Sequence, residues 1–99
     1  MKQTPVQATG MVWYLPEDFA EIKAMMVDGH VLHATHAKWQ AAAENGERTL
    51  SAQGVRIYRA ILRPADFKAW CERNNLKPDA SARNKFASEF AYREVQAGR

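Results

Sequence analysis

Several features that would identify a common class of protein are scarce or missing from this chain of 99 residues. Cys71 is the single cysteine, so no disulfide can form within the chain, and a reducing cytoplasmic location is expected. No apolar run approaches the roughly 20 residues of a membrane-spanning helix. The five glycines are scattered, and no serine stands in a Gly-x-Ser-x-Gly turn, so the motifs of phosphate-binding loops and of common serine hydrolases are absent.

The composition is that of a small soluble domain. Hydrophobic residues make up 46% of the chain and charged residues 25%, which argues against disorder. A chain of this length forms one domain and hides only part of its surface, so its ten aromatic rings are expected to supply much of the core. Residues 1–10 contain Pro5 and Gly10 without apolar periodicity, so we predict a flexible tail there and a single domain over 11–97.

Acidic and basic residues divide unevenly between the two halves of the chain. Residues 1–54 carry four Lys/Arg against six acidic residues, a net charge of −2, whereas residues 55–99 carry ten against five, a net charge of +5. A basic half can bind nucleic acid. The same asymmetry can equally attract one half of the chain to the other, or one subunit to the next.

A short sequence motif occurs twice and suggests the architecture. An apolar run over 12–15 and another over 55–62 each lead to a Pro-x-Asp-Phe sequence, at Pro16 and at Pro64. Proline suits the first turn of a helix, and an acidic residue there stabilises the helix dipole. The order predicted is β-α-α-β-α-α, an α+β domain whose small two-stranded sheet is covered by four helices. If the motif marks an internal repeat about a twofold axis, the strands would be antiparallel; chance similarity is the other explanation.

Helix boundaries are marked by residues that favour helix ends. Thr35 is a predicted N-cap for a second helix. Asn45-Gly46 is also a turn signal at which this helix could break; the apolar stripe keeps its phase across the glycine, so we favour a helix that continues to about residue 53. The third helix ends at Asn74-Asn75, and Asp79 caps a fourth whose inner face should carry Ala82, Phe86, Phe90 and Val95.

The residue types that carry chemistry have structural interpretations in this sequence. His30, His33 and His36 recur at three-residue steps but cross a predicted loop, which disfavours a metal site. Cys71 falls within a helix after Trp70, where a buried, unreactive thiol is expected. Asp18 and Asp66 are explained by their places in first helical turns. We therefore predict no enzyme activity, no catalytic residue, and no cofactor or metal.

Most of the chain after residue 11, including the region from Asp28 to Trp39, resembles a known group. The run Phe67-Lys68-Ala69-Trp70-Cys71, followed by Pro78 through Ala87, resembles a group of short uncharacterised bacterial proteins associated with mobile or integrated elements. The resemblance implies no activity. Arg83 is the basic position within its Ala-Arg-x-x-Phe-Ala motif, which makes it a candidate for contact with a partner.

The sequence thus favours a small cytoplasmic protein-interaction or regulatory module that acts as a homodimer or on a protein partner. An exposed strand edge of a two-stranded sheet favours pairing with a second copy. Binding of nucleic acid through the basic second half is the alternative function. The candidate partner-binding residues are Arg59, Arg63 and Arg83.

Overall fold

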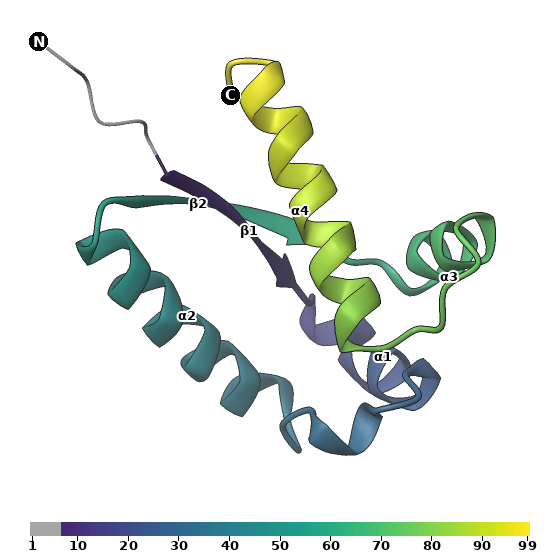
Figure 1. Cartoon of the computed structure of the whole chain (residues 1–99). Coiled ribbons are helices and arrows are strands. Elements are labelled where there is room, and N and C mark those ends of the chain that lie inside the picture. The colour runs from purple at the N-terminus through teal and green to yellow at the C-terminus, as the bar shows by residue number, and fades with distance from the viewer. Residues whose placement is uncertain (1–6) are drawn as a thin grey trace, which may run out of the picture.

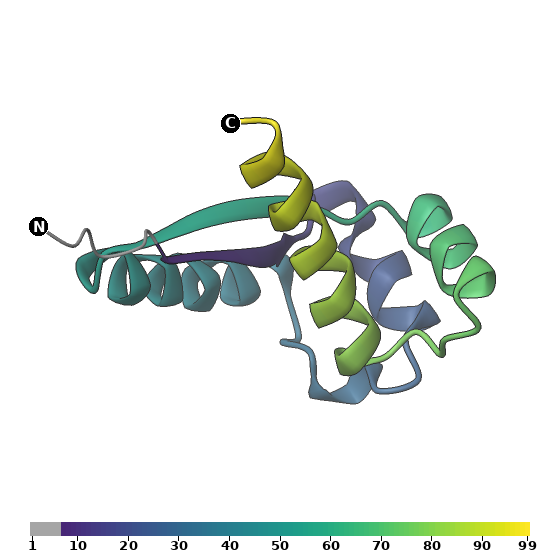
Figure 2. The same cartoon turned by 45° about the horizontal axis from the view of Figure 1, so that its top comes forward.

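A pair of parallel strands lies at the centre of the fold, with one long helix on each face (Figures 1 and 2). The structure is a computed structural model and describes residues 7–99. Its elements in chain order are β1 (Gln7–Trp13), the 3₁₀ turn η1 (Pro16–Asp18), α1 (Phe19–Met25), the 3₁₀ turn η2 (Gly29–Val31), α2 (His36–Ala52), β2 (Val55–Ile61), α3 (Pro64–Arg73) and α4 (Ala80–Gln96). This order and the α+β class confirm the architecture predicted from the sequence.

The strands are parallel, with Gly10 opposite Tyr58 and Trp13 opposite Ile61. The twofold, antiparallel form of the predicted repeat is therefore wrong. The physical reason is the connection, because α1 and α2 together form a helical crossover that returns the chain to the starting end of the sheet. The two copies of the motif have the same local structure: each strand is followed by a proline that begins a helical turn, Pro16 in η1 and Pro64 in α3.

The first strand begins earlier than the sequence predicted. Residues 7–10, which were assigned to the tail, form the first half of β1, while the rest of the predicted tail lies outside the described residues. Gly10 explains the difference, because a Cβ atom at this position would lie 1.9 Å from the carbonyl oxygen of Ala87 in α4. The glycine therefore permits a close crossing of helix and strand.

The predicted continuous helix α2 is confirmed. Thr35 caps it by accepting a hydrogen bond from the Lys38 amide at 3.2 Å, and it runs unbroken through Gly46 to Ala52. Gly54 follows with a φ of 84°, a left-handed conformation that favours glycine. Figure 2 shows α2 lying beneath the sheet, on the face opposite α4.

Helix α4 begins as predicted, and part of its predicted inner face is confirmed, since Ala82 is buried and Phe86 packs against Phe67 and Trp70. Asp79 caps it by accepting a hydrogen bond from the Ala82 amide at 2.9 Å. Ala87 and Ala91 are buried against the sheet, whereas Val95, predicted to be inward, is 48% exposed. Small side chains let the helix approach the strands closely, so the alanine stripe and not the predicted aromatic stripe faces the sheet.

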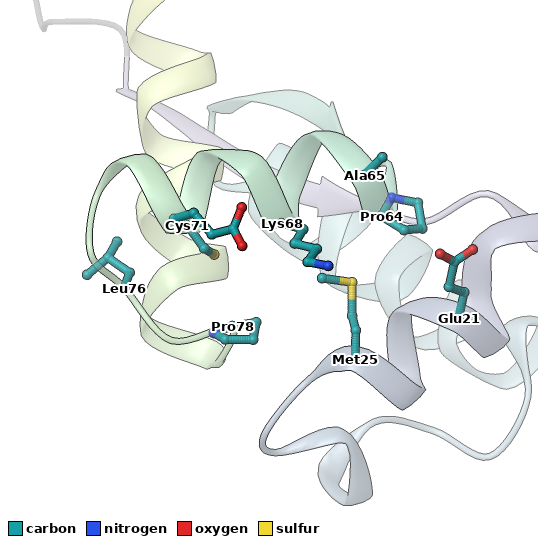
Figure 3. A pocket seen from close by; sticks show the side chains of 9 residues that line it. Glu21, Met25, Pro64, Ala65, Lys68, Cys71, Leu76 and Pro78 are labelled. Atoms are coloured by element: carbon teal, nitrogen blue, oxygen red, sulfur yellow. The ribbon is translucent and has the colours of Figure 1, made fainter.

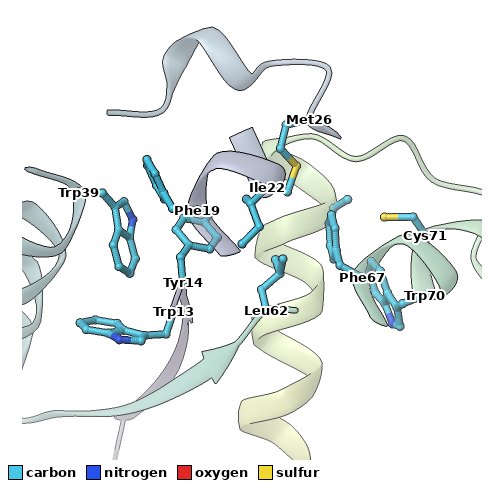
Figure 4. Close-up of a cluster of buried hydrophobic side chains, with 11 residues drawn as sticks. Trp13, Tyr14, Phe19, Ile22, Met26, Trp39, Leu62, Phe67, Trp70 and Cys71 are labelled. Carbon is cyan, nitrogen blue, oxygen red and sulfur yellow. The ribbon is translucent and has the colours of Figure 1, made fainter. Parts of the chain in front are cut away.

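The core gathers at the carboxyl ends of the two strands (Figure 4). Its largest fully buried side chains are Tyr14, Ile22, Leu62 and Phe67. Around them pack Trp13 and Trp39, whose ring centroids are 5.0 Å apart, so the aromatic residues do supply much of the core. No helix within residues 7–99 has the length and apolar content needed to cross a membrane.

Candidate interaction surfaces

Arg59 forms an ion pair on the face of the sheet that α2 covers. Its Nε and Nη2 atoms donate hydrogen bonds to the Glu47 carboxylate at 2.6 and 2.8 Å. Its guanidinium carbon lies 3.6 Å from the centroid of the Trp13 ring. The pKa of Glu47 is lowered, chiefly by the hydrogen bonds from Arg59. Arg59 thus binds α2 to β2 and β1 while half of its side chain remains exposed.

Arg83 is buried inside the fold. Its Nη1 and Nη2 atoms donate hydrogen bonds to Asp28 at 2.8 and 3.2 Å, and the residue is only 7% exposed. Asp28 also accepts a hydrogen bond from the Ala80 amide at 3.2 Å. The hydrogen bonds from Arg83 are the largest influence on the Asp28 carboxyl and lower its pKa. This pair joins the loop after α1 to the start of α4 and leaves little of Arg83 for a partner.

Arg63 pairs with Asp18 at the carboxyl ends of the strands. The Arg63 Nε atom lies 2.5 Å from Asp18 Oδ2, an ion pair without the alignment of a hydrogen bond. Asp18 is buried at 7% exposure, and its carboxylate makes no capping hydrogen bond to α1. The acidic residue that the sequence explained as a helix-end charge therefore also links η1 to the segment after β2.

The three predicted arginines share one property and do not share a surface. Each pairs with an acidic residue of the first half of the chain, so the uneven charge distribution attracts one half of the molecule to the other. This was one of the alternatives that the sequence left open. Because Arg59 lies on the α2 face, Arg63 precedes α3 and Arg83 lies within α4, the structure does not bring them together as one binding site.

A cavity of about 570 Å³ separates α1 from α3 (Figure 3). Met25 and Lys68 extend toward each other across it, and the Cys71 thiol lies in its wall. Cys71 is 3% exposed, and burial raises the pKa of its thiol, to which Asp79 and Glu72 add. A raised pKa disfavours the thiolate that nucleophilic chemistry requires.

The histidines have separate surroundings. The His36 ring packs edge-on against Phe19, and its Nε2 atom lies 2.7 Å from the carbonyl oxygen of Tyr14, so this histidine is part of the core. His30 and His33 are exposed. Within the part of the chain that the structure describes, no three His, Cys, Asp or Glu side chains are grouped as metal ligands. Burial raises the pKa of the neighbouring Tyr14 to about 12.

The outer edge of β2 is a surface that sequence reasoning did not locate. The sheet contains only β1 and β2 among the described residues, so each strand has one edge without a strand beside it. The residues of β2 whose backbone groups point to this edge include Ile61, which is 52% exposed, and the half-buried Val55 and Ile57; their side chains stand on the sheet face that α2 covers. The signal was present in the sequence, because β-branched residues at alternate positions stand on one face of the strand.

The comparisons with known proteins give one match. The family described as a domain of unknown function (DUF8829) matches residues 3–97. Searches of curated proteins and of solved structures find no match.

Proposed function

The chain belongs to this family of unknown function, and from its structure we propose that it is a non-catalytic protein-interaction module that forms a homodimer through the outer edge of β2. The single observation that carries the proposal is the unpaired, β-branched edge of β2 with Ile61 half exposed. The outer edge of β1 is a poorer candidate, because α4 packs chiefly on β1 and crosses it at Gly10.

The backbone groups along this edge follow from the register. The Leu62 amide donates to the Trp13 carbonyl at 3.0 Å, so the even-numbered residues of β2 direct their backbone groups toward β1. In a parallel ladder alternate residues point to opposite edges, so Val55, Ile57, Arg59 and Ile61 direct theirs outward. Four residues of the strand thus offer donors and acceptors to another strand.

An antiparallel pair of β2 strands fits the side chains of this edge. With the twofold axis at Tyr58, Val55 lies opposite Ile61 of the second copy, and Arg59 lies opposite Ile57. Apolar pairs opposite each other stabilise a sheet, whereas like charges opposite each other would destabilise it. This register places Arg59 opposite Ile57 and Arg56 opposite Ala60, so no two arginines lie opposite each other, and Glu47 already neutralises Arg59 within its own chain.

A non-catalytic role in the cytoplasm agrees with the state of the most reactive groups. Cys71 is buried with a raised pKa, and Tyr14 is 1% exposed with a pKa of about 12. Neither group is poised to ionise near neutral pH. The ion pair of the buried Arg83 with Asp28, and that of the half-exposed Arg63 with the buried Asp18, contribute to the fold that presents the β2 edge.

Light scattering coupled to size exclusion tests the proposal. At tens of micromolar we expect twice the chain mass of 11.2 kDa. Ile61→Lys places a charge in the pairing edge and should give a monomer. Val31→Lys is the matched control, because Val31 is 61% exposed and lies in η2. A monomeric parent chain, or equal loss of the dimer in both variants, would contradict the proposal.

A further inference from the structure

Three hollows that share lining residues follow α4; the first lies on the surface of the helix alone, and the other two lie between the helix and the sheet face opposite α2. The first is lined by Lys85, Tyr92 and Arg93, and the second adds Ala8 and Gly10 of β1. The third is lined by Ala8, Arg56, Tyr58 and Arg99. Neighbouring hollows share residues, Tyr92 at one junction and Ala8 at the other. From Lys85 to the end of α4 these hollows follow the helix for about 17 Å, at roughly 1.5 Å per residue. Together we call them the α4 groove.

Of the four cations that line the α4 groove, Arg99 is paired with Glu94, and the other three are unpaired, as Lys68, Arg73 and Lys77 also are among the described residues. Within residues 7–99, Arg56, Lys85 and Arg93 form no ion pair. The carboxylate that lines this groove, Glu89, accepts a hydrogen bond from the Trp70 indole at 3.3 Å. The groove therefore carries net positive charge that the fold does not use.

Two tyrosines lie among these cations. Tyr92 is 66% exposed and is the most exposed large apolar side chain of the described residues. Tyr58 is half-buried; its hydroxyl donates to the Arg99 carbonyl at 2.5 Å, and the Arg56 guanidinium carbon lies 5.2 Å from its ring centroid. An exposed aromatic ring beside unpaired cations is suited to stacking on a base while the cations contact phosphates.

We infer that the α4 groove binds single-stranded nucleic acid, with Tyr92 as the stacking residue and Arg56, Lys85 and Arg93 as phosphate contacts. A single strand fits better than a duplex because its base faces are accessible to the tyrosine. The site lies within one chain, so it does not depend on pairing through β2. Arg59, Arg63 and Arg83 do not line the groove, and each is held in an internal ion pair.

Fluorescence anisotropy with short labelled oligo-dT and oligo-rU measures binding to the groove. We expect binding at low salt that is weaker for a duplex of the same length. Tyr92→Ala should weaken binding roughly 5- to 150-fold, the effect of losing one stacked base. Val27→Ala, which truncates another apolar side chain of 60% exposure, should leave affinity unchanged.

The salt dependence tests the phosphate contacts separately. Lys85→Gln with Arg93→Gln should flatten the slope of log K against log salt by about 1.4, or 0.7 for each contact to a single strand. Lys68→Gln with Arg73→Gln removes the same charge from α3 and should leave the slope unchanged. Thermal unfolding confirms that each variant is folded. Absence of binding at low salt, or equal losses in the α3 control, would overturn the inference.

Discussion

The two ends of the sheet differ in what surrounds them. At the carboxyl ends of the strands, Tyr14 and Leu62 are almost completely buried beneath helices that begin directly after each strand. At the amino ends, Gln7, Ala8 and Arg56 are exposed. One end of the molecule therefore contains most of the packed core. The α4 groove extends from Glu89, which accepts a hydrogen bond from the core residue Trp70, to the open end, and the outer edge of β2 runs between the two ends. The packed core, which supplies most of the stability, and the proposed binding surfaces therefore lie largely in different parts of the molecule.

The ion pairs also differ in exposure, but not by end, since Arg63 at the packed end is 50% exposed in its pair with Asp18. At the packed end, Arg83 and Asp28 have side-chain exposures of 8% and 23%. Arg59, whose guanidinium lies over the Trp13 ring, is 48% exposed in its pair with Glu47. Buried partners depend on each other strongly, because removing one leaves a charge without compensation, whereas water screens an exposed pair. Neutralising the acidic partner should therefore lower the free energy of unfolding more at the buried Arg83–Asp28 pair than at the exposed Arg59–Glu47 pair.

The largest expected difference concerns aromatic residues at the two ends. Phe67 is completely buried and packs against Trp70 and Phe86 at centroid distances of 5.8 and 5.5 Å. Phe67→Ala should lower the free energy of unfolding by about 3–5 kcal/mol because it leaves a cavity. Tyr92→Ala should change it by no more than about 0.5 kcal/mol. Urea unfolding of both variants tests the division, and comparable losses would contradict it.

A second prediction concerns the crossing point of α4 and β1. Gly10→Ala places a methyl group against the Ala87 carbonyl, a backbone atom that cannot move aside without displacing the helix. We expect a loss of about 3 kcal/mol, the upper part of the usual range for overpacking. Gly46→Ala is the matched control, because its Cβ would meet only the end of the Met11 side chain at 3.8 Å, and helix propensity favours alanine. Thermal unfolding that ranks Gly46→Ala as the more damaging would contradict this account.

The smallest expected difference in the free energy of unfolding is between substitutions of the two carboxylates, Asp28 and Glu47. Asp28→Asn should cost about 2 kcal/mol, less than the loss of a fully buried partner, and Glu47→Gln at most about 1 kcal/mol. The Asp28 contribution depends on pH. Because its pKa in the folded state is below the ordinary value of 3.8, its stabilisation is complete above that value. It is lost as the pH falls through the lowered pKa. Unfolding measured between neutral and acidic pH should show less acid sensitivity in Asp28→Asn than in the parent chain.

Much of the local structure was predictable because its causes are local. The caps Thr35 and Asp79 and the prolines at 16 and 64 act within one helical turn, and all four open helical segments. The start of β1 was not predictable, because Gly10 suggests a loop until Ala87 is known to pass over it. The part of the α4 inner face that contacts the sheet was missed for the same reason: depth of approach to the sheet decides which stripe is buried.

The candidate site was predicted only in its general character. The sequence identified a basic second half, but Arg59, Arg63 and Arg83 neutralise acidic residues of the first half. The residues of the α4 groove were not distinguishable from them in sequence, since ion pairing depends on contacts between distant segments. Tyr92 carries a weak signal, because it directly follows Ala91 of the buried stripe and so borders the sheet.

The sequence by itself determined the α+β order, the helix limits and the uneven charge, because propensity, capping and composition act over a few residues. Only the tertiary structure decided that the strands are parallel, which cations are paired within the fold, and which strand edge and groove remain open. Those outcomes depend on how segments about fifty residues apart meet, as Asp28 and Arg83 do, and no local pattern encodes that meeting.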